Sequence, residues 1–237
     1  MQGKSIKRFY KQVDSAAGPE GFAIRLDGKP VKTPIGRRLE VPAPALAEAI
    51  AAEWLAQEAE VRPASMPLTQ LASTALDRVG PERAAIAAQM MDYAGTDLLC
   101  YRADFPPDLA ERQARHWQPL LDWADEALGS RLTVTAGIVA VTQPETALTA
   151  LRAHLDGLDV WRLTAAQSAC AATGSLVLAL ALTAGRIDAA QAFALAHLDE
   201  DYQIEKWGED YEAADRRAAL RADLEAAERL LALCRLA

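Results

Sequence analysis

The chain has 237 residues, of which 51% are hydrophobic and 24% charged, with a formal net charge of −8. This length and composition exclude a disulfide-stabilised miniprotein and a disordered chain, and they predict a soluble, helix-rich globular protein. Three widely spaced cysteines, Cys100, Cys170 and Cys234, predict neither a disulfide framework nor a cysteine zinc site. A reducing compartment therefore fits best.

The first forty residues predict strands. Ile6–Val13 and Phe22–Leu26 are rich in β-branched and aromatic residues, and Asp27-Gly28 supplies a tight hairpin turn. A second turn at residues 33–36 precedes Arg38–Val41. Three or four short antiparallel strands are too few to be stable without a covering partner, which we expect to be a helix.

This β-rich segment is also basic. Residues 1–38 contain nine Lys/Arg and three Asp/Glu, a local charge of +6 that leaves −14 for the rest of the chain. The acidic bulk would repel phosphates, and the basic residues form no motif with interleaved aromatic residues. We therefore expect no nucleic-acid partner.

From Pro42 onward the hydrophobic period becomes helical. Helices are predicted at residues 44–55, 68–79, 81–95, 107–129, 145–156, 164–184, 188–207 and 209–235. Gly129 should end the fourth of these, and Pro119 should either kink it or divide it in two. A short strand is predicted at 98–102 and a short strand pair at 133–141. The fold class is therefore α+β, with a small antiparallel β-rich amino-terminal domain at residues 1–42, or to about 60 with a covering helix, and a larger α-helical bundle domain at 43–237.

Two features bear on localisation. The amino-terminal residues MQGKSIKRFYKQVD lack the apolar run of a secretory signal, so we expect a cytoplasmic protein. The charge-free segment 164–185 has the length of a membrane span, roughly 20 residues. Polar residues dilute it, however, and we expect a buried central helix and no membrane insertion.

Common catalytic motifs are absent from the sequence. It contains no GxGxxG, HExxH or GxSxG pattern. His197 and Asp201 lie four residues apart, and a surface pair is the simpler interpretation of this spacing than a catalytic dyad. We expect no cofactor, no metal and no catalytic residue.

The stretch EDYQIEKWGEDYEA, residues 200–213, is unusually acidic. Eight carboxylates and one cation, Lys206, lie between Asp199 and Asp215. Gly208 is expected to end one helix, so that Glu209, Asp210 and Glu212 favour the dipole of the next. The acids from Asp199 to Glu205 would instead oppose the dipole of the preceding helix. A partner surface and a solvated face remain equally open, and the spacing matches no cation-binding loop.

Several blocks resemble one family. The residues Tyr202–Asp210, YQIEKWGED, are similar to the carboxy-terminal signature of the F-type ATP synthase assembly chaperone family that binds the isolated α subunit. Other blocks follow in the family's order: Leu26–Pro34, Glu53-Trp54 with Gln57, Met66–Thr69, Asp97–Arg102, Trp117 with Pro119, and Gly174-Ser175. The resemblance covers nearly the whole chain.

The resemblance implies an assembly chaperone and not an enzyme. It would hold the α subunit until the β subunit replaces it, as a bacterial cytoplasmic protein that is monomeric when free. The resemblance implies that Glu205 and its neighbours Glu200, Glu209 and Asp210 bind the partner. We expect Gln203 of the same block to take part, and Trp207 or Trp54 to supply a buried anchor. The alternatives are a carboxylate-dependent hydrolase with Glu205 or Glu209 as general base, and a passive scaffold.

Overall fold

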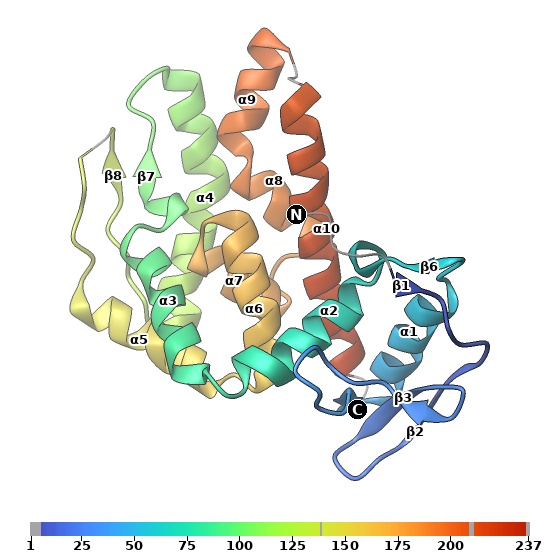
Figure 1. Cartoon of the computed structure of the whole chain (residues 1–237). Helices are drawn as coiled ribbons and strands as arrows, with labels where there is room; N and C mark the ends of the chain where they lie inside the picture. The colour runs from blue at the N-terminus through green and yellow to red at the C-terminus, as the bar shows by residue number, and fades with distance from the viewer. Residues whose placement is uncertain (1–5, 138, 209–210, 236–237) are drawn as a thin grey trace. The chain divides into compact units, whose positions relative to one another are not determined.

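The computed structural model describes residues 6–137, 139–208 and 211–235 (Figure 1). Its described residues form two compact units. The first comprises the chain up to Arg83 together with the residues from Arg229 onward, and the second comprises Ala84–Glu228. The predicted boundary at residue 42, or about 60, lies inside the first unit.

The first unit is built on a four-stranded antiparallel sheet. Strand β3 (Phe22–Leu26) pairs with β2 (Val13–Ala17), β4 (Lys29–Pro30) and β5 (Glu40–Val41). The predicted turn between β3 and β4 is confirmed, because Asp27 and Gly28 have φ values of 48° and 78°. A separate pair joins β1 (Ile6–Lys7) to β6 (Glu60–Val61).

Helix α1 (Pro44–Leu55) packs on β2 and β3 as the covering helix. Its buried face includes Leu46 and Ile50, which are inaccessible to solvent. The Glu53 carboxylate accepts hydrogen bonds of 2.8 Å from the backbone N–H groups of both Leu68 and Thr69. These are free donors in the first turn of α2 (Pro67–Thr74), which a short π-helix (Ala75–Val79) continues.

The second unit is helical. Its elements are α3 (Arg83–Gly95), a 3₁₀ turn (Leu98–Cys100), β7 (Tyr101–Arg102), α4 (Pro107–Leu128), β8 (Thr135–Ala136), α5 (Glu145–Gly157), α6 (Val160–Thr173), α7 (Leu176–Ala184), α8 (Ala189–Ala196), α9 (Leu198–Trp207) and α10 (Tyr211–Cys234). The last turns of α10 belong to the first unit. The fold is α+β, with a small antiparallel β region followed by a helical region, as predicted.

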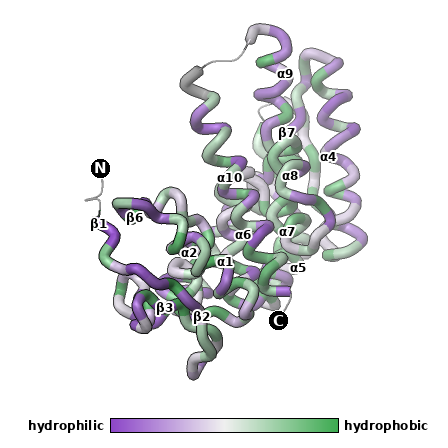
Figure 2. Tube along the Cα trace, turned by 90° about the vertical axis from the view of Figure 1, so that its right-hand side faces the viewer, coloured by the Kyte–Doolittle hydropathy of each residue, from purple (hydrophilic) through white to green (hydrophobic). Residues whose placement is uncertain are grey.

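Helix α7 forms the centre of the second unit. Every residue from Leu176 to Thr183 is buried, and α7 packs against α4, α6 and α8. Figure 2 shows the contrast between the mainly hydrophobic α7 and the largely hydrophilic α4. Burial of this apolar surface is the main stabilising contribution to the helical unit.

A buried carboxylate fixes the amino terminus of α7. Asp97 accepts hydrogen bonds from Ser175 Oγ (2.8 Å), the Val177 N–H (3.1 Å) and the Leu99 N–H (3.1 Å). Ser175 in turn caps α7 by accepting from the Leu178 N–H. Burial raises the pKa of Asp97, and the hydrogen bonds oppose that effect.

Two helices that were predicted to be continuous are each divided into two, so these predictions are wrong. The segment 164–184 is divided because Gly174 adopts a left-handed conformation (φ 68°) and Ser175 begins a new helix. The segment 188–207 is divided at His197 into α8 and α9. Within the described ranges, no helix is long and apolar enough to cross a membrane.

Candidate partner-binding site

Helix α9 carries most of the acidic stretch, and its start differs from the prediction. Because α8 ends before His197, Asp199, Glu200 and Asp201 lie in the first turn of α9. The dipole favours negative charge there, so the prediction that these three residues oppose it is wrong. Glu205 lies near the end of the helix. The predicted end is confirmed, since α9 stops at Trp207 and Gly208 follows with φ 89°.

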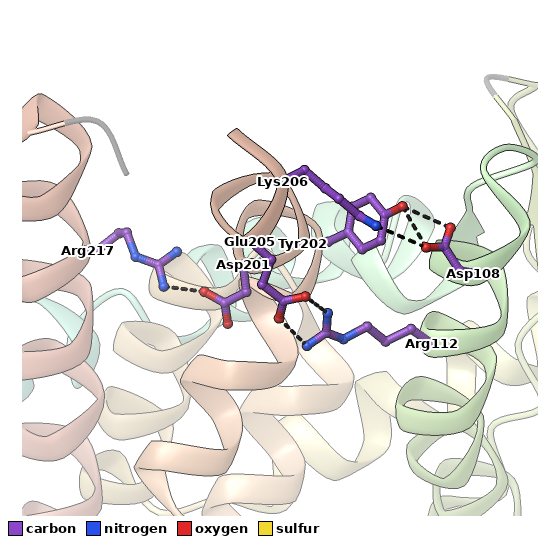
Figure 3. A network of polar contacts seen from close by, with 7 residues as sticks. All are labelled: Asp108, Arg112, Asp201, Tyr202, Glu205, Lys206 and Arg217. Carbon is purple, nitrogen blue, oxygen red and sulfur yellow. Dashed lines mark hydrogen bonds and ion pairs between the residues drawn. The ribbon is translucent and has the colours of Figure 1, made fainter. Parts of the chain in front are cut away.

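Arginines from two neighbouring helices pair with the acids of α9 (Figure 3). Arg112 of α4 donates two hydrogen bonds of 2.7 Å to the two carboxylate oxygens of Glu205. Arg217 of α10 donates to Glu200 (2.8 Å) and to Asp201. Lys206 is therefore not the only cation that compensates the charge of this stretch.

A second set of contacts joins α9 to α4. The hydroxyl of the buried Tyr202 donates to the Asp108 carboxylate at 2.8 Å, and Lys206 Nζ lies 3.6 Å from the same carboxylate (Figure 3). Asp199 accepts a hydrogen bond of 2.7 Å from the Gln113 amide. These contacts fix the rotation of α9 about its axis, with one side toward α4.

The electrostatics follow from these pairs. The hydrogen bond from Arg112 lowers the pKa of Glu205, and the hydrogen bond from Tyr202 lowers the pKa of Asp108. Both carboxyl groups are therefore ionised at neutral pH. His197 does not bond to the Asp201 side chain as expected: its ring stacks on Phe193 with centroids 4.2 Å apart.

The predicted site residues divide between two sides of α9. Glu200, Gln203 and Trp207 have the spacing i, i+3, i+7 and share one face, whereas Glu205 turns toward α4 and Arg112. Trp207 is 78% exposed, and Gln203 is also exposed. An exposed tryptophan is a common feature of binding surfaces. We use the name α9 surface for the predicted site residues on both sides of this helix, which are Glu200, Gln203, Glu205 and Trp207.

The remaining predicted residues lie elsewhere. Glu209 and Asp210 lie outside the described residues. Trp54 belongs to the first unit, where its ring meets that of Tyr10 edge-on at 5.7 Å and its carbonyl oxygen accepts from the Tyr10 hydroxyl at 2.6 Å. No group of three metal-ligating side chains among the described residues is arranged to hold an ion.

Sequence reasoning missed the residues that hold α9 in place. Arg112 and Glu205 are 93 positions apart, and Asp108 and Tyr202 are 94 apart. No local spacing signals such pairs. The amphipathic pattern of α4 does indicate which residues of that helix face outward, but not which helix they meet.

Comparisons with known proteins give one family for most of the chain. The family model for ATP12 chaperone proteins matches residues 7–125. Protein atp12 of Schizosaccharomyces pombe, a mitochondrial protein, is 29% identical over 216 residues, covering 86% of this chain and 74% of that protein. Its Saccharomyces cerevisiae counterpart is 23% identical over 261 residues, covering 90% and 80%.

A crystal structure gives the same result in three dimensions. Atp12 from Paracoccus denitrificans superposes with a TM-score of 0.92 at 42% sequence identity, covering 96% of this chain and 98% of that one. The chain therefore belongs to the ATP12 chaperone family, whose members assist ATP synthase assembly.

Proposed function

We propose that this chain binds the unassembled α subunit of F-type ATP synthase, shields its interface from aggregation, and is displaced by the β subunit. The observation that carries the proposal is family membership over nearly the whole chain, including the fold of Paracoccus Atp12. The identity of the subunit rests on the resemblance of several blocks, among them Tyr202–Asp210, to the family that binds the isolated α subunit. A bacterial cytoplasmic location and a monomeric free state stay predictions.

The proposed task requires a particular kind of surface. A subunit destined for a ring exposes a large apolar interface before assembly, and such surfaces promote aggregation. A chaperone that covers this interface needs an apolar anchor together with polar groups that set the orientation. The α9 surface offers Trp207, 78% exposed, beside the exposed polar side chain of Gln203.

The ion pairs of α9 change the role expected of its acids. A carboxylate has about four acceptor positions, and the Arg112 fork uses two of those on Glu205. The Glu205 side chain is still 53% exposed. We propose that Arg112 and Arg217 orient α9, and that the free acceptor positions of Glu200 and Glu205 meet basic residues of the partner. Glu209 and Asp210, which follow α9 in the sequence, stay predicted partner-binding residues.

The hydrolase alternative gains no support from Glu205. Its pKa is lowered by Arg112, which makes the carboxylate a weaker base, and the side chain is open to water. The chaperone family also indicates a non-enzymatic role.

The proposal is tested with isolated α subunit diluted from denaturant, with light scattering as the readout and without nucleotide or metal. We expect the chain to suppress aggregation at near-equal molar ratio. Suppression at a small fraction of that ratio, or loss of the effect on adding a chelator, would instead favour an enzyme.

Two variants test the α9 surface in the same assay. Trp207→Ser removes the exposed anchor and Glu205→Gln removes one charge, and each should weaken capture about ten-fold. The melting temperature should match wild type for Trp207→Ser and fall only slightly for Glu205→Gln, which weakens the exposed pair with Arg112. Val139→Ser, at a position 69% exposed in the same unit, is the matched control and should behave as wild type. If all three variants capture equally well, the α9 surface is not the binding site.

A further inference from the structure

The first unit contains a pocket of about 320 Å³ with aromatic walls. Phe9 and Tyr10 come from the segment between β1 and β2, Trp54 comes from α1, and Lys29 and Lys32 come from β4 and the residues after it. We call this the aromatic pocket. Its volume is at the lower end of the range for ligand sites and suits one or two side chains.

The aromatic walls are fixed to one another. The rings of Phe9 and Tyr10 meet edge-on with centroids 5.4 Å apart, and the Tyr10 ring meets Trp54 in the same way. Tyr10 is buried and its hydroxyl is bonded to the Trp54 carbonyl oxygen. The pocket is thus preformed, which lowers the entropy cost of binding.

Apolar side chains are exposed at the aromatic pocket and next to it. Phe9 is 70% exposed, and Leu55, next to Trp54, is 56% exposed. The indole N–H of Trp54 is closed to solvent and has no acceptor among the described residues. The exposed apolar side chains are the surface that an occupant would cover.

The edge of the pocket is cationic. Lys29 and Lys32 are exposed, and neither pairs with a carboxylate within the described ranges. Asp27 also lines the pocket, but its carboxylate already accepts from the backbone N–H groups of Lys11 and Gln12. Residues 1–38 carry a net charge of +6. The charge that complements this edge is negative.

We propose that the aromatic pocket binds a segment of the same ATP synthase subunit, one in which an apolar side chain is flanked by Asp or Glu. This inference rests on the proposed function and adds a second contact with its own chemistry. The apolar side chain would enter between Phe9 and Trp54, and the flanking acid would lie against Lys29 and Lys32. Because this edge is cationic and the α9 surface is acidic, the two contacts would select client segments of opposite charge.

Binding of isolated α subunit by the full chain tests the proposal. Phe9→Ser and the double variant Lys29→Glu/Lys32→Glu should each raise the Kd for the α subunit about ten-fold or more, and the double variant should also reduce the dependence of binding on salt. All the substituted side chains are exposed, so melting temperatures should match wild type. The controls Val139→Ser and Arg131→Glu, at exposed positions of the other unit, should leave the Kd within about two-fold.

A photo-crosslinker placed at Phe9 identifies the occupant. With p-benzoylphenylalanine at this position, we expect crosslinks to α-subunit peptides that contain Asp or Glu within a few residues. Crosslinks confined to neutral or basic peptides would overturn the proposal. So would variants that bind the subunit like wild type, or a pocket that binds anionic phospholipid vesicles and not the subunit.

These outcomes separate the two proposals. If wild type binds the α subunit and the pocket variants do too, the aromatic pocket is not a contact and the proposed function stands. If wild type does not bind the α subunit, the proposed function fails, and this inference fails with it.

Discussion

Asp97 is the most deeply buried of the carboxylates described above. Its side chain is fully buried and accepts hydrogen bonds from Ser175, Val177 and Leu99. Asp97→Ala leaves these donors without an acceptor and should lower the free energy of unfolding by about 3 kcal/mol. Urea denaturation followed by circular dichroism measures the loss. Ser175→Ala removes the cap of α7 and one donor to Asp97 but leaves the other two donors paired, so it should cost less, about 1 to 2 kcal/mol, and equal costs for the two variants would contradict this account.

The pair between Glu205 and Arg112 predicts a pH dependence. The folded-state pKa of Glu205 is lowered from its ordinary value of 4.5, chiefly by the hydrogen bond from Arg112. A lowered carboxyl pKa means that the pair stabilises the fold above the unfolded-state pKa, and that this contribution is lost as pH falls through the folded-state pKa. NMR titration of the Glu205 carboxyl carbon should therefore give a midpoint below 4.5.

The companion variant for this titration is Arg112→Ala. It should return the Glu205 midpoint toward the ordinary value, and it should flatten the fall in melting temperature on acidification. A Glu205 midpoint that does not move in this variant would show that the pair does not form in solution.

At the scale of single residues, the sequence identified the acidic stretch but did not predict which side chains its residues contact. The acids of residues 199–215 could be counted, and Trp207 could be singled out as an aromatic residue beside them. Their compensation by Arg112 and Arg217 could not be predicted, because those pairs depend on how α4, α9 and α10 pack. For the same reason, the sequence did not predict that Asp97 is fully buried, although Asp97 belongs to the block Asp97–Arg102.

At the scale of elements, the strongest local signals were the turn and cap residues. Asp27-Gly28, Gly129 and Gly208 end or reverse elements where the sequence predicted it. The break at His197 was missed because the surrounding residues, ALAHLDE, contain no glycine or proline. At that break the His197 ring stacks on Phe193, and its Nδ1 lies at hydrogen-bond distance, 3.0 Å, from the Phe193 carbonyl oxygen. Because of this break, Asp199, Glu200 and Asp201 lie in the first turn of α9 and not near the end of one long helix.

Arg217 joins α10 to the two helices on either side of this break. Its guanidinium bonds to Glu200 and Asp201 of α9 and lies 5.2 Å from the Phe193 ring of α8. Arg217→Ala should loosen α9 by about 1 kcal/mol, which is roughly a five-fold increase in amide hydrogen exchange. Mass-spectrometric exchange on the peptide covering residues 198–207 measures the effect. Arg131→Ala, at an 88% exposed arginine, is the control and should leave this peptide unchanged.

At the scale of the whole molecule, the change of hydrophobic period near Pro42 predicted an antiparallel β region followed by helices. That prediction is confirmed, because periods of 2 and 3.6 report directly on which side chains a sheet or helix buries. The sequence did not predict the extent of the first unit. It continues through α2 to Arg83 and takes in residues from Arg229, and such closure by a distant segment leaves no local sign in the sequence.

The proposed release by the β subunit predicts an exchange reaction. When β subunit is added to a complex of α subunit with fluorescently labelled chaperone, the label should leave the complex on size exclusion as α and β associate. An equal concentration of an unrelated protein should release none of it. Label that stays with the α and β subunits would identify a scaffold and contradict the proposed displacement.

The direction of this exchange follows from the kinds of interface involved. Permanent interfaces between subunits bury about 2,000 Å² or more and are largely apolar. The contacts proposed here consist of one exposed tryptophan with polar neighbours and one pocket of about 320 Å³ with a lysine edge. Contacts of this kind suit a transient complex, whose charged edges favour rapid association over long lifetime. Trp207→Ser should accordingly accelerate release, whereas a β subunit unable to pair with α should not release the chaperone at all.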